Sequence, residues 1–338
     1  MPPPPGRFIA DAHEDIAFHC QEYSRDFGDP GATPCMITLP WLRRGGVRLI
    51  CATLFAMHRQ PEDLRRLKLT RQVEMYQRWF SLYPDVFVPV RSQADLARLA
   101  TAQPTTGPDG IQAYPVGVIL LMEGLELLAS PNELSAWFER GVRLASITWD
   151  GVNRFGSGSF GDHSGLSSEG FALLKEFANL GMILDLSHLC DAGCRDAFRH
   201  YHGPLCATHS NARSLAALER NISDEQAAEL GRRGGVIGLN LLAPLLIAGW
   251  RREHGQPPLS AATAHTLHLA GLIGEAHVGL GSDLDGGLTV ENTPLGIERV
   301  DQLGLLAGEL ERQGWGAEAL LGFLGANWWR FFERSLPA

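Results

Sequence analysis

The hydrophobic residues of this chain gather in short, nearly continuous runs that are rich in valine, isoleucine and leucine. Eight such runs are each followed by a loop and a segment with helical periodicity, and they cover residues 8–13, 47–55, 116–123, 143–149, 181–188, 204–210, 235–243 and 277–285. Continuous apolar runs are typical of strands that are buried on both faces, with helices as their cover. Eight units of this kind predict an α/β fold, the (β/α)8 or TIM barrel.

The segments between the runs complete this prediction. Helices are expected at residues 61–80, 92–102, 131–140, 166–179, 223–233 and 260–273. A ninth apolar run at residues 86–90 contains a proline and is followed by Arg91 and Ser92, neither of which is a metal-type ligand. We therefore expect this run outside the barrel.

No linker rich in proline or in serine and glycine divides the chain, so we expect one metallohydrolase domain over residues 1–338. Residues 1–7 include four prolines and are expected to form an extended lead-in to the first strand. Tryptophan and phenylalanine residues crowd the C-terminal segment around residues 328–332. We expect them to pack a C-terminal helix on the barrel rather than to hold a cofactor.

The composition describes a globular protein, with 45% hydrophobic and 20% charged residues. Its net charge of −9, without a long basic run, argues against a nucleic acid or an anionic membrane as a partner. No apolar run approaches the roughly 20 residues of a membrane-spanning helix, and the proline-rich N-terminus does not resemble a secretion signal. Six cysteines without a CxxC pair indicate reduced thiols, so we expect a cytoplasmic protein.

Titratable residues follow the ends of several predicted strands. They are His13, Asp15, Glu123, His188, His209, Asp283 and Asp285. Catalytic residues of such barrels project from the carboxyl ends of the strands, so these side chains are expected to meet at one mouth. Taken singly, a histidine is more often a structural hydrogen-bonding group, and the two final aspartates are also common turn formers. Taken together, they are too costly to bury unless they pair or bind cations, so the set predicts a divalent metal site.

Imidazoles combined with carboxylates suit zinc or a similar ion. Because a carboxylate can bridge two ions, a central Glu123 among histidine and aspartate ligands indicates a binuclear site. Two such ions activate water, stabilise the developing oxyanion and orient the substrate, which predicts hydrolysis. Asp185 precedes His188 and leaves two readings open, since it either orients a ligand or is satisfied by the backbone.

Six motifs along the chain resemble one family. They are DAHED at 11–15, MEGLELL at 122–128, LDLSHL at 184–189, ATHSNARS at 207–214, RNISD at 220–224 and GSDLDG at 281–286. In this order, and over nearly the whole chain, they resemble the renal or membrane dipeptidase family, the M19 metallopeptidases of the amidohydrolase superfamily. The resemblance implies a zinc-dependent dipeptidase that uses a metal-bridging hydroxide and acts on dipeptides with a free C-terminal carboxylate.

The resemblance also implies roles for individual residues. His13 and Asp15 would hold one zinc ion, His188 and His209 the second, and Glu123 would bridge the two.

Glu123 and Asp283 are then the expected catalytic residues, with Asp283 taking a proton from the hydroxide and passing one to the leaving amine. Arg220 is expected to pair with the substrate carboxylate, and Trp149 and Asn153 are further expected substrate-binding residues. Proteins of this kind are commonly dimers, so a homodimer is also expected, although no residue identifies its interface.

Trp149 departs from the better-known members, which carry a histidine there that is thought to polarise the scissile carbonyl. An indole N–H is a neutral donor, so this position puts the substrate in question. The alternatives are a related amide, lactam or D-configured dipeptide as substrate, or a non-catalytic metal-binding protein of the same fold. A third alternative is a nucleotide enzyme built on GSGSFG at residues 156–161, but this segment does not open a helix directly, and we expect an active-site loop instead.

Overall fold

The computed structural model describes residues 8–29, 31, 33–107, 110–287 and 289–338. The lead-in expected at residues 1–7 lies outside these described residues.

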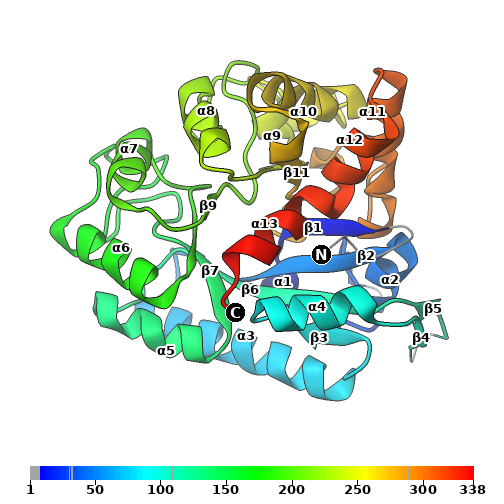
Figure 1. Ribbon diagram of the computed structural model, residues 1–338, viewed down its shortest axis with the longest axis horizontal. Coiled ribbons are helices and arrows are strands. Elements are labelled where there is room, and N and C mark those ends of the chain that lie inside the picture. The colour runs from blue at the N-terminus through cyan, green and yellow to red at the C-terminus, as the bar shows by residue number, and fades with distance from the viewer. Residues whose placement is uncertain (1–7, 30, 32, 108–109, 288) are drawn as a thin grey trace.

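Eight parallel strands form a nearly closed barrel (Figure 1). They are β1 (Ile9–Glu14), β2 (Val47–Leu54), β6 (Val116–Glu123), β7 (Val142–Ser146), β8 (Ile183–Asp185), β9 (Leu205–Cys206), β10 (Ile237–Leu239) and β11 (Val278–Leu280). Neighbours pair in the order β10-β11-β1-β2-β6-β7-β8-β9, and a parallel bridge from Ala207 to Ile237 joins the two ends of this row. The predicted (β/α)8 barrel is thus confirmed.

The ninth run forms β3 (Phe87–Pro89), which pairs with the first residues of β6, from Val116 to Val118. Strand β7 pairs with β6 only from Leu120 onward. Strand β3 therefore belongs to the sheet but takes no place in the ring of eight, as its proline indicated. A separate small hairpin is formed by β4 (Thr105–Thr106) and β5 (Gln112–Ala113).

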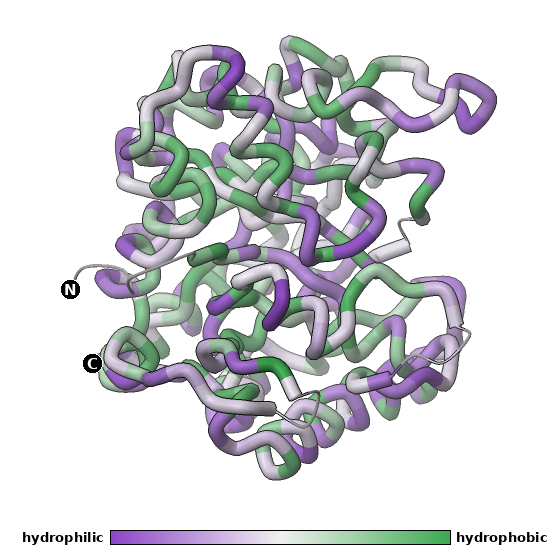
Figure 2. The backbone as a smooth tube through the Cα atoms, turned by 90° about the vertical axis from the view of Figure 1, so that its right-hand side faces the viewer, coloured by the Kyte–Doolittle hydropathy of each residue, from purple (hydrophilic) through white to green (hydrophobic). Residues whose placement is uncertain are grey.

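Helices surround the barrel. They are α1 (Ile16–Tyr23), α2 (Leu39–Gly45), α3 (Glu62–Leu82), α4 (Gln93–Thr101), α5 (Leu134–Glu139), α6 (Ser168–Leu180), α7 (Asp191–His200), α8 (Asp224–Arg232), α9 (Ala243–Leu246), α10 (Leu259–Ile273), α11 (Gly304–Arg312), α12 (Ala317–Leu321) and α13 (Asn327–Ser335). Hydrophilic and hydrophobic residues alternate along the outer turns (Figure 2), as expected for helices with one buried side. Every helix among the described residues is too short or too polar to cross a lipid bilayer.

Helix α13 closes the bottom of the barrel, where the strands begin. Trp328 and Trp329 are fully buried beside Phe8 and the small barrel-lining residues Ala10 and Ala12. The indole Nε1 of Trp328 donates to the carbonyl of Leu280 at 2.8 Å, so its polar atom is satisfied in the core. The C-terminal aromatic residues are therefore packing residues, which leaves the opposite end of the barrel for chemistry.

Five predicted strands end well before their apolar runs. The runs at 143–149, 181–188, 204–210, 235–243 and 277–285 leave the sheet after β7, β8, β9, β10 and β11 and continue as loops, apart from Ala243, where α9 begins. These loops carry His188, His209 and Asp283. The apolar pattern continues past the strand ends because the loop residues are also buried.

Candidate active site

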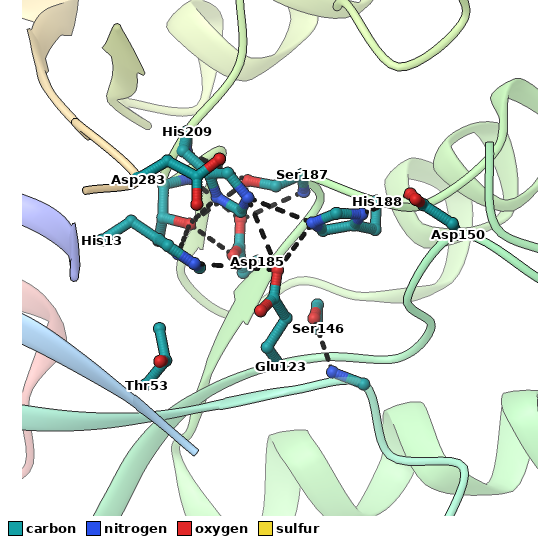
Figure 3. Close-up of polar contacts among 12 residues, drawn as sticks. His13, Thr53, Glu123, Ser146, Asp150, Asp185, Ser187, His188, His209 and Asp283 are labelled. Carbon is teal, nitrogen blue, oxygen red and sulfur yellow. Dashed lines mark hydrogen bonds and ion pairs between the residues drawn. The ribbon is translucent and has the colours of Figure 1, made fainter. Parts of the chain in front are cut away.

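The five expected metal ligands come together at the carboxyl end of the barrel. Figure 3 labels His13, Glu123, His188 and His209 of this set. The Nε2 atoms of His188, His209 and His13 lie 2.6, 3.5 and 3.7 Å from Glu123 Oε1. Asp15 completes the cluster, with its Oδ2 3.6 Å from His13 Nε2, and the Thr53 hydroxyl donates to its other oxygen. All five side chains are buried, so water contributes little to offsetting their charges.

Thr208 and Asp185 fix how His13 and His209 present their rings. The Thr208 hydroxyl lies 3.2 Å from Nδ1 of His13 and 2.9 Å from Nδ1 of His209, and it donates to Asp185 Oδ2 at 2.6 Å. Because its single hydrogen goes to Asp185, it accepts an N–H from each imidazole. Both rings then turn the lone pair of Nε2 toward Glu123.

Asp185 thus contacts the ligands through Thr208, and the backbone N–H groups of Ser187 and Thr208 also satisfy its Oδ1, so both readings that its sequence position left open apply. It lies near the ligand atoms of His13 and His209, but both its oxygens already accept hydrogen bonds from Thr208. Thr208 is a residue that the sequence motifs contained but that sequence reasoning did not single out. Its role depends on a through-space contact between strands, not on a spacing in the chain.

Asp150 performs the same task for His188, and sequence reasoning missed it. Its Oδ1 lies 2.8 Å from His188 Nδ1, on the side of the ring away from Glu123. Burial raises the pKa of Asp150, but the hydrogen bond and charge of His188 outweigh this and hold the pKa below its ordinary value. The available signal was its position after Trp149, at the end of a predicted strand.

The cluster fits a divalent metal. Burial lowers the pKa of His13, but the charges of Glu123 and Asp15 outweigh burial and raise it to about 10. His13 Nε2 is buried and has no hydrogen-bond partner among the described residues. A metal cation would bind His13 Nε2. It would also supply the positive charge that protons otherwise supply beside Glu123 and Asp15.

Two overlapping groups of ligands share one carboxylate. Glu123, His188 and His209 form one group and His13, Asp15 and Glu123 form the other, each with ligand atoms within 4.8 Å of one another. Glu123 is the residue common to both groups, and a binuclear site stays a prediction.

Asp283 lies beside the metal-ligand cluster on a strained turn. Its φ of 63° is left-handed, a region that aspartate tolerates better than most residues. Its backbone N–H donates to the His13 carbonyl at 3.0 Å, and Asn240 Nδ2 donates to its Oδ2 at 3.0 Å. Gly286 packs directly on this turn, since a Cβ there would collide with the carboxylates of both Asp15 and Asp283. Burial raises the pKa of Asp283, so the side chain holds a proton more readily than a surface aspartate.

The expectation that Asp285 reaches the same mouth is wrong. Its carboxylate turns away, with Oδ2 2.6 Å from Arg25 and Oδ1 accepting from the Met36 N–H at 2.7 Å. Asp285 is itself the second left-handed residue of this turn, with φ 64°, and its carboxylate points behind the site.

A cavity of about 350 Å³ opens over the cluster, and both Arg220 and Trp149 line it. The Arg220 guanidinium lies 3.1 Å from His188 Nε2 and 3.3 Å from the Ser210 hydroxyl oxygen. Asn153 is not among the cavity-lining residues: its amide donates to the Ile147 carbonyl and accepts from the Phe155 N–H, which holds the following loop. A substrate contact for Asn153 stays a prediction.

The glycine-rich segment at residues 156–161 forms a loop against the site. Its Ser159 N–H donates to the His188 carbonyl at 2.9 Å, and its Phe160 N–H donates to the Asp150 carbonyl at 2.8 Å. Helix α6 begins only at Ser168, so this segment lacks the helix start that a dinucleotide fingerprint requires. Phe160 lines the cavity, as expected for an active-site loop.

A barrel of eight parallel strands with imidazoles and carboxylates at its carboxyl end defines a metal-dependent hydrolase of the amidohydrolase class. Residues 7–335 match the family model of the membrane dipeptidases, peptidase family M19, and the chain belongs to that family. The resemblance found in the six motifs is confirmed, and the protein is accordingly a metallo-dipeptidase-type hydrolase.

Individual proteins are also similar to this chain in sequence. An uncharacterized protein in the pqqA 5′ region of Klebsiella pneumoniae is 35% identical over 60% of this chain and 75% of its own. Dipeptidase aclJ of Aspergillus oryzae is 28% identical over 94% of this chain and 76% of its own.

Solved structures share the fold. The dipeptidase AC, a metallopeptidase of family M19, superimposes with a TM-score of 0.83 at 25% identity and covers 100% of both chains. A Rhodobacter sphaeroides metallopeptidase bound to a phosphinate mimic of L-Ala-D-Ala gives a TM-score of 0.81 at 24% identity, over 99% of this chain and 100% of its own.

Proposed function

We propose that this protein is a zinc-dependent dipeptidase that hydrolyses the amide bond of dipeptides with a free C-terminal carboxylate. The observation that carries the proposal is the convergence of three imidazole Nε2 atoms on Glu123 Oε1, with their Nδ1 atoms tied to Thr208 and Asp150. Membership of the dipeptidase family supports the substrate class.

In this proposal His13 and Asp15 would hold one zinc ion, His188 and His209 would hold the other, and Glu123 is the ligand that the two groups share. The partnerless Nε2 of His13 and the mixed nitrogen and oxygen donor set fit zinc. When bound, the two ions supply an activated water and stabilise negative charge on the carbonyl oxygen.

Asp283 moves the proton in this proposal. Asn240 holds one of its oxygens, and the residue lines the cavity beside Asp15. Because burial raises its pKa, Asp283 can take a proton from the attacking water and keep it until the leaving amine needs it.

Arg220 binds the substrate carboxylate in this proposal. Its side chain is 5% exposed and, among the described residues, forms no ion pair with a carboxylate. A buried guanidinium without an internal anion is costly, and a planar fork suits a carboxylate ligand. The cavity wall thus offers an anion site, with the Arg220 guanidinium 3.1 Å from His188 Nε2 beside the ligand cluster.

The test uses purified protein reloaded with zinc and a panel of L-Xaa-L-Xaa and L-Xaa-D-Xaa dipeptides. We expect hydrolysis of free dipeptides, its loss with a chelator, its return with zinc, and little activity on C-terminally amidated dipeptides. If the protein hydrolysed lactams or other amides but no dipeptide, the result would favour the alternative raised by the neutral indole of Trp149, a related amide or lactam as the substrate. Zinc binding without any hydrolysis would identify a non-catalytic protein.

A further inference from the structure

The cavity above the metal-ligand cluster has two chemically different apolar walls. Phe18, Phe55, Met57 and Trp149 form what we call the aromatic wall. Leu218, Leu242, Pro244 and Leu245 form what we call the aliphatic wall. A dipeptide has two side chains, so the arrangement raises the question of which wall each one meets.

The aromatic wall is continuous with the ligand cluster. The rings of Phe18 and Phe55 lie 5.2 Å apart between centroids, those of Phe55 and Trp149 lie 5.1 Å apart, and Trp149 lies 6.1 Å from His188. Phe55 lies two residues after Thr53, whose hydroxyl donates a hydrogen bond to Asp15. This wall therefore borders the Asp15 and His188 side of the cluster.

The aliphatic wall is attached to Arg220. The Leu218 carbonyl accepts from the Asn221 N–H at 3.0 Å, and the Leu245 carbonyl accepts from the Asn221 side-chain amide at 3.0 Å. Asn221 is the residue after Arg220, so Leu218 and Leu245 are held beside the proposed carboxylate anchor.

The same wall is also attached to Asp283. The Leu242 N–H donates to Asn240 Oδ1 at 2.7 Å, and the Asn240 amide nitrogen donates to Asp283 Oδ2 at 3.0 Å. In a dipeptide, the carboxylate and the leaving amine belong to the same residue, the C-terminal one. The two groups that act on that residue, Arg220 and Asp283, thus flank one wall.

We propose that the aliphatic wall receives the side chain of the C-terminal residue and the aromatic wall receives that of the N-terminal residue. This inference rests on the proposed dipeptidase function. It assigns the substrate class as dipeptides with an aliphatic C-terminal residue and an aromatic or other large apolar N-terminal residue. The cavity volume of about 350 Å³ is at the small end of the roughly 300–1,000 Å³ typical of ligand sites, which fits two residues.

Charged side chains are disfavoured at both positions. None of the eight wall residues carries a charge, so a carboxylate or ammonium placed against either wall loses water without gaining a charged partner from that wall. Differences of about 10-fold or more in kcat/KM follow from single methylene changes in apolar pockets, and larger ones follow from a buried charge.

The test compares kcat/KM for Ala-Ala, Ala-Leu, Phe-Ala, Ala-Asp and Asp-Ala with zinc-loaded protein and three variants. Leu245→Ala is expected to lower the Ala-Leu to Ala-Ala ratio about 10-fold and to leave the Phe-Ala to Ala-Ala ratio near its original value. Phe55→Ala is expected to lower the Phe-Ala to Ala-Ala ratio about 10-fold and to leave the Ala-Leu to Ala-Ala ratio near its original value. Leu215→Ala removes a 44%-exposed leucine outside the cavity lining and should change neither ratio.

Leu245→Val and Phe55→Leu repeat the test with smaller volume changes, in case the alanine variants fold poorly. The assignment would be overturned if Leu245→Ala lowered the Phe-Ala ratio and Phe55→Ala lowered the Ala-Leu ratio. It would also be overturned if each variant lowered both ratios equally. Equal rates on Ala-Leu and Ala-Asp in the unchanged protein would overturn it too. A zinc-loaded protein that cleaves no dipeptide at all would contradict the proposed function itself, which is a distinguishable result.

Discussion

Asp283 and Asp285 stand two residues apart in one motif, both on left-handed backbone, yet their surroundings differ. Asp285 lies behind the site, where Arg25 and the Met36 N–H meet its two oxygens. The Asp283 carboxylate lines the cavity and, among the described residues, accepts one hydrogen bond, from the Asn240 side chain. Burial raises the pKa of both carboxyls, for Asp285 to about 6 even though Arg25 lowers it.

The difference separates a carboxylate that supports the fold from one available for chemistry. The supporting region supplies its own counter-charge, whereas the mouth gathers Asp15, Glu123 and Asp283 with no ion pair to a lysine or arginine among the described residues. A buried group of carboxylates lacking such cations either takes up protons or binds a metal cation.

The largest expected effect comes from exchanging each aspartate for asparagine, which tolerates the same left-handed backbone. Asp283→Asn should retain bound zinc and lose at least the roughly 10²–10⁴-fold that a general acid–base typically contributes to kcat. Asp285→Asn should retain kcat per folded molecule but lose stability, because Arg25 then stays buried without a counter-charge. The cost of breaking such a pair is about 3–5 kcal/mol.

Metal content, steady-state kinetics and thermal unfolding of the two variants, measured side by side, check this prediction. An active Asp283→Asn variant, or an Asp285→Asn variant that folds normally but is inactive, would remove the distinction between the two regions.

A smaller effect is expected at Asp150, which extends the comparison to the histidine ligands. Asp150→Asn keeps the size of the side chain but removes the charge that holds His188 in place. Loss of such an orienting partner typically weakens metal binding about 10- to 100-fold. Competition with a chromophoric chelator measures the change in zinc affinity, and Asp162→Asn, an exposed aspartate in the same loop region, is the control. An unchanged affinity in Asp150→Asn would show that His188 needs no orienting carboxylate.

The fold could be predicted from the sequence because its strands are buried on both faces and read as continuous apolar runs. The lengths of the strands could not be predicted from the sequence. The loops that follow β8, β9, β10 and β11 are buried as well, so they extend the apolar runs beyond the strands. The extra strand β3 could be separated through its proline and through the lack of a metal-type ligand after it.

The metal-ligand cluster was predictable because its ligands sit at strand ends within recognisable motifs. Thr208, Asp150 and Asn240 were not found, since each acts through a partner that is distant in the chain. Asp285 was misplaced because it is itself the second left-handed residue of the turn, and its side chain points behind the site. Nothing in the local pattern of residues indicates that direction.

The most direct test of the account is the number of zinc ions bound per chain in active protein. Metal-free protein is titrated with zinc, freed of excess metal and analysed by mass spectrometry of the metal together with dipeptide hydrolysis. The account predicts two ions per chain at full activity, and fewer than two in Glu123→Gln, whose amide cannot bridge as a carboxylate does. Full activity with one ion or none would contradict it.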